Sequence, residues 1–159
     1  MGVHRLTRIA LLAALCVIGR IGFQFMPNIQ PMTAIIICSG VLLGSFVAMS
    51  VALIATYVSN LLLGMGIWTV WQIVAWGIIG VLSGQFRRFE STPSLLWLIT
   101  FGIFCGYLYG IIVNIGTWMY TGKYFVYYLT SLPFDSLHAI GNVLFLVFLY
   151  PVMSRYVYQ

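Results

Sequence analysis

Residues 34–63 form one uncharged and mostly apolar block. About 20 helical residues cross the hydrocarbon core of a bilayer, so this block is too long for one ordinary helix. Backbone groups inside a bilayer must bond to one another, which favours helices. Gly44 and Ser45 interrupt the block, and we predict two helices joined by a tight turn near Gly44, the first short and the second ending at Ser59 and Asn60. The alternative is one tilted span.

The rest of the chain repeats this apolar character. Of its 159 residues, 62% are hydrophobic and only 6% are charged, whereas about a quarter of the residues in soluble domains are charged. This composition predicts an all-α, polytopic membrane protein with a single domain at residues 1–159. Together with the two helices of the block, we predict six transmembrane helices, the others being near residues 6–25, 69–86, 95–120 and 132–156.

The basic residues predict the orientation. If the N-terminus is cytoplasmic, Lys123 is the only lysine or arginine in a predicted outer loop. The residues that then fall on the inner side are Arg5, Arg8, Arg87, Arg88 and Arg155. This asymmetry requires an even number of spans, so both termini are expected in the cytoplasm. It also explains the net charge of +5 without a nucleic-acid partner.

The stretch at residues 60–84 is unusual for a membrane helix. It contains Trp68, Trp71 and Trp76, together with Gln72 and a Gly-x-Gly turn. An apolar cavity with a few convergent polar groups needs such residues, because it must hold a flat, partly polar molecule in one orientation. We therefore predict that this stretch forms part of a binding pocket.

Two charged residues lie inside predicted spans. Arg20 either snorkels to the outer headgroups or lines a cavity, where it contacts substrate or Asp135. Asp135, His138 and Asn142 share one helical face, as binding groups or as an N-cap followed by interhelical hydrogen bonds. Asp135 and His138 offer only two ligands, so we predict no metal site, and no cofactor.

The candidate substrate-binding residues share a place in the outer half of the spans or in the outer segment at residues 26–33. They are Arg20, Asn28, Gln30, Asn60, Trp68, Trp71, Gln72, Trp76, Asn114, Trp118, Asp135 and His138. Most tryptophans fall in this half, whereas interfacial belts would place them at both surfaces. The bias favours a pocket that opens outwards.

The inner half of the first span has a different pattern. Ala10, Ala13 and Ala14 form a stripe of small residues, and small residues let helix backbones approach closely in lipid. The stripe predicts a packing face, either within the protein or for a partner. The chain has no Walker A pattern, so any uphill transport needs energy from another polypeptide.

Three segments resemble the substrate-binding S components of energy-coupling factor (ECF) vitamin transporters. They are TRIALLAAL at residues 7–15, PNIQPMTAIIICSGVLLG at residues 27–44 and SNLLLGMGIWTVWQIVAWGIIGVLSG at residues 59–84. The third is the most specific, because the S-N, L-G-x-G, W-T, W-Q and A-W-G elements are typical of this group at this spacing. The chain departs from the family at Ile67 and Val70, where many relatives have proline.

The resemblance implies a non-enzymatic subunit of a bacterial plasma-membrane importer that binds a vitamin from outside. It also implies partners, namely a transmembrane scaffold subunit and two ATPase subunits, with Ala10 and Ala14 meeting the scaffold. The W-T-x-W-Q series is most similar to the cobalamin-type members, so cobalamin or cobinamide is the expected ligand. Pyridoxine, thiamine and a queuosine precursor are alternatives within the family.

Two other classes of protein stay open. One is a membrane-embedded enzyme that uses Asp135 and His138 as an acid–base pair, although the sequence offers no third catalytic group. The other is a small assembly subunit in which the polar residues only join helices.

Overall fold

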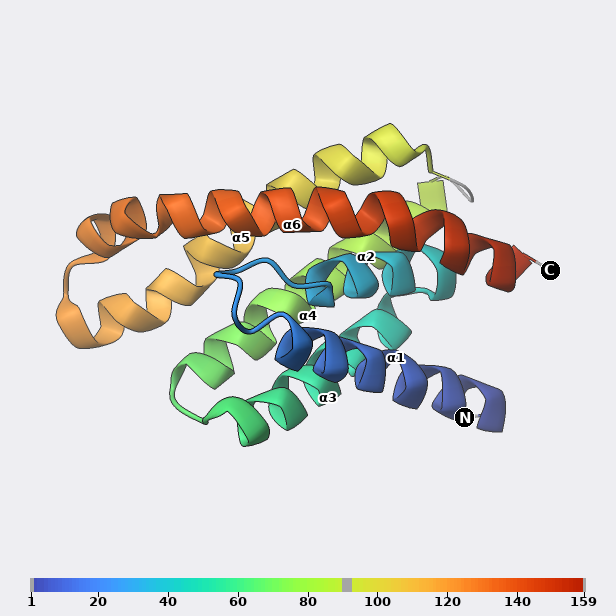
Figure 1. Ribbon diagram of the computed structural model, residues 1–159, viewed down its shortest axis with the longest axis horizontal. Helices are drawn as coiled ribbons and strands as arrows, with labels where there is room; N and C mark the ends of the chain where they lie inside the picture. Colours follow the sequence, from blue (N-terminus) through green and yellow to red (C-terminus); the bar gives the residue numbers. More distant parts are fainter. Residues whose placement is uncertain (1, 90–92, 159) are drawn as a thin grey trace.

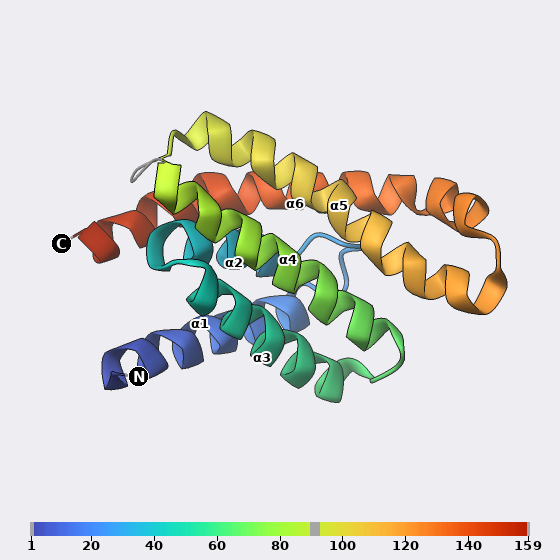
Figure 2. The same ribbon diagram turned by 180° about the vertical axis from the view of Figure 1, so that it is seen from behind.

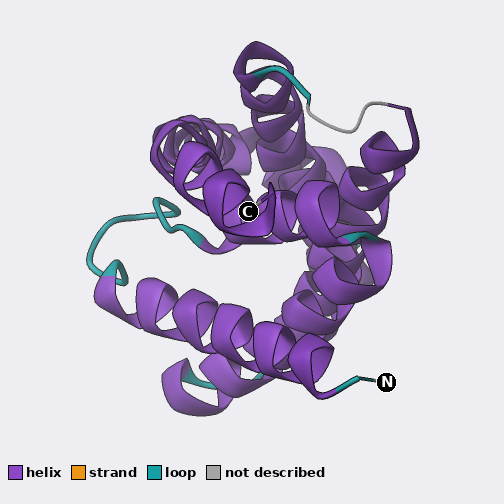
Figure 3. Cartoon of the chain, turned by 90° about the vertical axis from the view of Figure 1, so that its right-hand side faces the viewer, coloured by secondary structure: helices purple, strands orange, loops and turns teal. Residues whose placement is uncertain are grey.

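The computed structural model describes residues 2–89 and 93–158, and within these it consists of helices joined by short loops and turns (Figures 1 and 3). The helices are α1 (Val3–Gly22), α2 (Met32–Leu43), α3 (Ser45–Leu63), α4 (Trp68–Phe89), α5 (Leu95–Thr121) and α6 (Tyr124–Tyr158). Both termini lie at the same end of the bundle, at the right in Figure 1. The all-helical prediction is confirmed for the described residues.

The short helix α2 is the centre of the bundle. It contacts α1, α3, α4, α5 and α6, and almost all of its side chains are buried. A helix that is apolar on every side needs neighbours all round, which explains why its 12 residues show no polar face. At about 18 Å it is shorter than the hydrocarbon core.

The tight turn predicted near Gly44 is confirmed. Gly44 separates α2 from α3 and has φ of 96°, a backbone conformation that favours glycine. The predicted end of α3 at Ser59 and Asn60 is wrong by one turn, because the helix continues to Leu63. Gly64, with φ of 116°, follows as the turn into α4, and α3 and α4 then run antiparallel (Figure 2).

The predicted start of the last span near residue 132 is wrong. Helix α6 begins at Tyr124, and the segment predicted as an outer loop, residues 121–131, is helical apart from Gly122 and Lys123, which join α5 to α6. The hydroxyls of Thr130 and Ser131 bond to carbonyls one turn earlier, so these polar residues do not break the helix. Asp135 therefore lies inside α6, and its predicted role as an N-cap is also wrong.

The predicted spans are supported in part. By length and composition, α3, α4, α5 and α6 could each cross a membrane. Helix α1 has 20 residues but carries three arginines. Large apolar side chains such as Leu11 and Phe148 are 66% and 71% exposed, as expected for a lipid-facing surface. Six helices are present in the described part, and six spans with cytoplasmic termini stay a prediction.

The pair formed by α5 and α6 has the most extensive contact in the bundle. Gly102, Gly106 and Gly110 lie four residues apart on the face of α5 that meets α6. A Cβ atom at Gly106 would lie 2.8 Å from backbone atoms of Ala139, so the helices approach as closely as glycine allows.

This close approach predicts that Gly106→Leu destabilises the protein. The added side chain must push α5 and α6 apart, which we expect to cost about 1–3 kcal/mol. Thermal unfolding in detergent measures this as a melting temperature several degrees lower. Gly77→Leu on α4 is the matched control, because nothing lies within 4 Å of a Cβ atom there. Equal melting temperatures for the two variants would contradict the tight packing.

Candidate functional site

Helices α1, α3 and α4 meet in a polar network, which we define as Arg20, Ser59, Asn60, Thr69 and Gln72. Arg20 donates from Nη1 to Ser59 Oγ at 2.7 Å and from Nη2 to Gln72 Oε1 at 3.3 Å. Asn60 donates from Nδ2 to the same Gln72 oxygen at 2.8 Å and to Thr69 Oγ1 at 3.0 Å. The reversal at Gly64 allows this, because it returns the chain so that the start of α4 lies beside the end of α3.

A series of tilted and edge-to-face ring contacts, which we call the aromatic stack, adjoins the network. We define it as Trp76, Tyr109 and His138, from α4, α5 and α6. The Arg20 guanidinium lies 5.1 Å from the centroid of the Trp76 ring, a cation–π geometry. The Trp76 and Tyr109 centroids are 4.7 Å apart, and those of Tyr109 and His138 are 4.8 Å apart. The stack therefore joins Arg20 on α1 to His138 on α6 across the core.

Thr33 on the central helix α2 contacts both Trp76 and His138. Its Oγ1 accepts a hydrogen bond from Trp76 Nε1 at 2.8 Å and lies 2.8 Å from His138 Nε2. Thr33, Trp76 and His138 are all fully buried. Because Trp76 and His138 come from different helices, this single hydroxyl links α4 and α6 to α2.

Asp135 lies one turn before His138 on α6. It is 3% exposed, and its Oδ2 accepts a hydrogen bond from Ser131 at 3.0 Å. Asn114 on α5 reaches the same serine, with its Nδ2 2.9 Å from Ser131 Oγ. The Asp135 carboxyl group occupies the space beside Gly110 that a Cβ atom at this position would fill. Asp135 and Asn114 thus meet through Ser131 where α5 and α6 pack.

Arg20 and Asp135 do not pair in the structure. No salt bridge joins the two, and the hydrogen bonds of each go to uncharged side chains. Arg20 also does not extend towards the headgroups, which was the first alternative. Its side chain is half-buried and bonds to residues of α3 and α4.

Two buried polar atoms of α6 have no hydrogen-bond partner in the part of the chain that the structure describes. They are His138 Nδ1 and Asn142 Oδ1, which lie one turn apart on the same helical face. Buried polar atoms are nearly always bonded, so such a pair marks a place where a ligand atom or a bound water is expected.

The other candidate residues lie around this core without joining it. Trp68 and Trp118 are 50% and 49% exposed at the ends of α4 and α5 away from the termini. Trp71 packs against Gly116 of α5. Asn28 has φ of 56° and donates from Nδ2 to the carbonyl of Phe134 at 3.1 Å, so the loop before α2 is tied to α6. Gln30 is half-buried in the same loop.

Several residues of the site were absent from the candidates chosen by sequence. They are Thr33, Ser59, Thr69, Tyr109 and Ser131. Ser59 and Thr69 belong to the quoted S-N and W-T elements, so those elements could have identified them. Thr33 and Tyr109 carry no such signal, because their role depends on the central position of α2 and on the rotation of α5.

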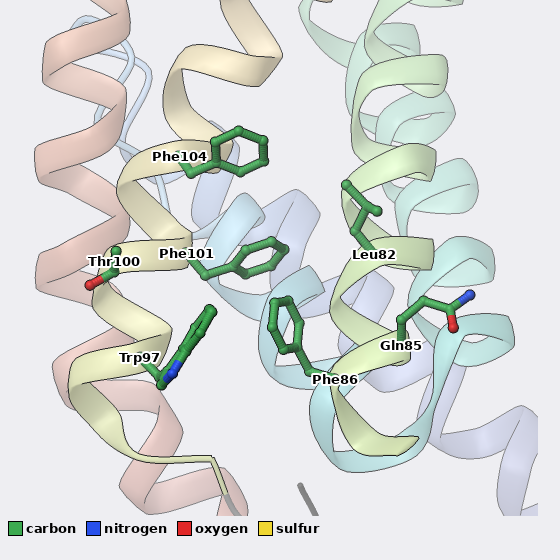
Figure 4. A pocket seen from close by; sticks show the side chains of 7 residues that line it. All are labelled: Leu82, Gln85, Phe86, Trp97, Thr100, Phe101 and Phe104. Atoms are coloured by element: carbon green, nitrogen blue, oxygen red, sulfur yellow. The ribbon is translucent and has the colours of Figure 1, made fainter. Parts of the chain in front are cut away.

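The site is closed in the structure. Asn60 is 1% exposed, and Trp76 and His138 are fully buried, so a ligand must separate these side chains to enter. An aromatic groove of about 440 Å³ lies elsewhere, between the C-terminal half of α4 and the N-terminal half of α5 (Figure 4). Its lining includes Phe86, Trp97 and Phe101, and none of the candidate residues.

The alanine stripe lines a second groove, between α1 and α3, with a volume of about 540 Å³. Ala10 and Ala14 are exposed in it, whereas Ala13 is 2% exposed and also packs into the core. Ile54 and Val58 form the wall on α3. The groove is apolar and runs along α1 from Leu6 to Ile18, and Arg20 is not among its lining residues.

A bundle of apolar helices that encloses a polar and aromatic cluster is the architecture of a membrane protein that binds a small molecule. The family model described as "ECF transporter, substrate-specific component" matches residues 4–154, and the chain belongs to this family. It is thus a substrate-specific subunit of an ECF importer, an integral membrane protein and not an enzyme. No curated protein and no solved structure matches the chain.

Proposed function

We propose that this protein captures a water-soluble vitamin outside the bacterial plasma membrane and delivers it through a scaffold subunit driven by two ATPase subunits. The observation that carries the proposal is the joining of the polar network to the aromatic stack in the half of the bundle away from the termini. Membership of the substrate-specific family supports it. The proposed topology has six spans, with both termini in the cytoplasm.

The proposed site has a core and a rim. In the core, Arg20 and Asp135 bind polar groups of the vitamin, Trp76 and His138 contact its rings, and amides give hydrogen-bond specificity. The core amides are Asn60, Gln72 and Asn114. The rim residues contact the ligand at the entrance to the core. They are Asn28, Gln30, Trp68, Trp71 and Trp118.

The proposed ligand is cobalamin or cobinamide. The W-T-x-W-Q series at residues 68–72 supports this choice, because it is most similar to the cobalamin-type members of the family. Pyridoxine, thiamine and a queuosine precursor are the next ligands to test. Since the site is closed, each of these requires the buried side chains of the core to move apart.

The proposed docking surface for the scaffold is the groove between α1 and α3. Ala10 and Ala14 leave space for a helix of the partner to approach the backbone of α1, and Ala13 forms the floor. No observation favours the enzyme alternative, since Asp135 and His138 bond to Ser131 and Thr33.

Co-purification tests the class of protein. The affinity-tagged chain is expressed in its native membranes together with the other proteins of the host. We expect one long-helix membrane protein and two ATPases to co-purify with it in stoichiometric amounts. Quantitative mass spectrometry of the detergent extract measures this. Ala14→Trp in the docking groove should lose these partners and serves as the matched control. Recovery of the folded wild-type chain without any ATPase would argue against the proposal.

A further inference from the structure

Two charged side chains of the site lack an oppositely charged partner in the part of the chain that the structure describes. Arg20 donates to the neutral groups of Ser59 and Gln72. Asp135 accepts a hydrogen bond from Ser131 through Oδ2, and no described residue donates one to Oδ1. A charge held away from water is costly unless a counter-charge offsets it. Glu90, the other acidic residue of the chain, lies outside the described residues.

The two charges adjoin different rings of the aromatic stack. Arg20 lies over Trp76, which contacts Tyr109, which contacts His138. Asp135 lies on the same face of α6 as His138, one turn earlier. The site therefore holds a positive group beside Trp76 and a negative group one turn from His138, and no ion pair joins them within the described residues.

His138 adds an independent sign of a missing partner beside Asp135. Its Nε2 is bonded to Thr33, while Nδ1 is fully buried and has no partner within the described residues. Nδ1 can donate or accept a hydrogen bond, depending on the tautomer. Near Asp135 the site thus has one fully buried polar atom without a partner among the described residues, His138 Nδ1.

We propose that the substrate is amphoteric, with an anionic oxygen group that pairs with Arg20 and an N–H donor that binds Asp135. This inference rests on the proposed function and narrows its substrate class. A carboxylate or a phosphate ester suits the guanidinium, which can donate two parallel hydrogen bonds. An amino group suits the carboxylate, and its neighbouring ring atom suits His138 Nδ1.

A structural role for Asp135 is the competing explanation. Its carboxyl group packs against Gly110 and accepts from Ser131, so it could simply join α5 and α6. The two explanations differ in what they require of Asp135→Asn. The amide has the same shape and keeps an acceptor for Ser131, so helix packing survives, while the attraction for a cationic or N–H-rich group falls.

Four ligands that share one pyridine ring and differ in two substituents test the proposal. The probes are pyridoxine, pyridoxamine, pyridoxine 5′-phosphate and pyridoxamine 5′-phosphate, which carry neither group, the amine, the phosphate, or both. Cobalamin and cobinamide form a second comparison, because only cobalamin has the phosphodiester. Isothermal titration of the purified full-length chain measures each affinity. We expect the probe with both groups, or cobalamin over cobinamide, to bind at least roughly ten-fold more tightly than its partners.

Two substitutions assign the groups to their binding residues. Arg20→Gln should remove the advantage of the phosphate and leave that of the amine, and Asp135→Asn should do the reverse. Melting temperatures show whether each variant is folded. If Arg20→Gln does not fold, Arg20→Lys takes its place, because it keeps the charge and loses the paired hydrogen bonds, so the phosphate advantage should shrink.

The outcomes separate this inference from the proposed function. Selectivity for the amphoteric probe that each substitution removes for its own group supports the inference. Tight binding of a vitamin without regard to these groups, or with unchanged selectivity in both variants, overturns it and leaves the proposed function standing. A folded protein that binds no vitamin in the panel overturns both.

Discussion

Ala14→Trp should abolish ATP-driven uptake while the isolated protein still binds its vitamin. The indole fills the groove between α1 and α3, where Ala14 is exposed, so a partner helix can no longer approach the backbone of α1. Arg20 lies further along α1 and bonds to α3 and α4, so the site stays intact. Uptake of labelled vitamin into proteoliposomes containing the whole complex measures the loss.

The groove also supplies controls for that experiment. Ala10→Trp should behave like Ala14→Trp, because both residues line the groove. Leu11→Trp places the same indole on the same helix but outside the groove, at a position that is 66% exposed, and should transport normally. Normal uptake in both alanine variants would refute the docking surface.

Trp76→Ala should remove vitamin binding and also weaken the fold. Trp76 is fully buried, packs on Tyr109 and donates to Thr33, so its truncation should cost about 3–5 kcal/mol of stability. Loss of binding in this variant alone would therefore be ambiguous. The expected fall in melting temperature, about 10 °C or more, is measured by thermal unfolding in detergent.

Trp76→Phe separates the two effects. It keeps an aromatic ring in the stack but removes the indole N–H that Thr33 accepts and weakens the contact with the Arg20 guanidinium. We expect a folded protein whose vitamin affinity is lower by roughly ten-fold. Trp97→Phe, in the groove at the other end of α4 and α5, is the matched control and should bind normally. Equal affinity in both variants would remove Trp76 from the site.

The helix pattern could be predicted where one local feature decides it. Gly44 adopts a positive φ and breaks the apolar block where expected. The start of α6 could not be predicted in this way, because Thr130, Ser131 and Pro133 resemble breakers in sequence. In the structure the two hydroxyls bond within the helix, and Pro133 is accommodated inside it. Whether a polar residue breaks a helix depends on bonds that the sequence does not show.

The residues of the site divide in the same way, into those that the sequence predicts and those whose contacts depend on packing. Arg20, Asn60 and Gln72 were predicted to share the outer half of the spans, and a short reversal between α3 and α4 is enough to bring the two amides beside Arg20. Thr33 was not expected, because its contacts with Trp76 and His138 arise only when α2 occupies the centre of the bundle. The separation of Arg20 from Asp135 is likewise a property of the packing, since the sequence allowed them to pair.

Equilibrium binding of vitamins to the purified chain tests the central claim most directly. The protein, in detergent and without its partners, is titrated with a panel of water-soluble vitamins, cobalamin and cobinamide first, and heat or fluorescence reports saturation. We expect saturable binding of one vitamin at one site per chain, weakened by Trp76→Phe and unchanged by Trp97→Phe. A folded protein that binds none of them would contradict it.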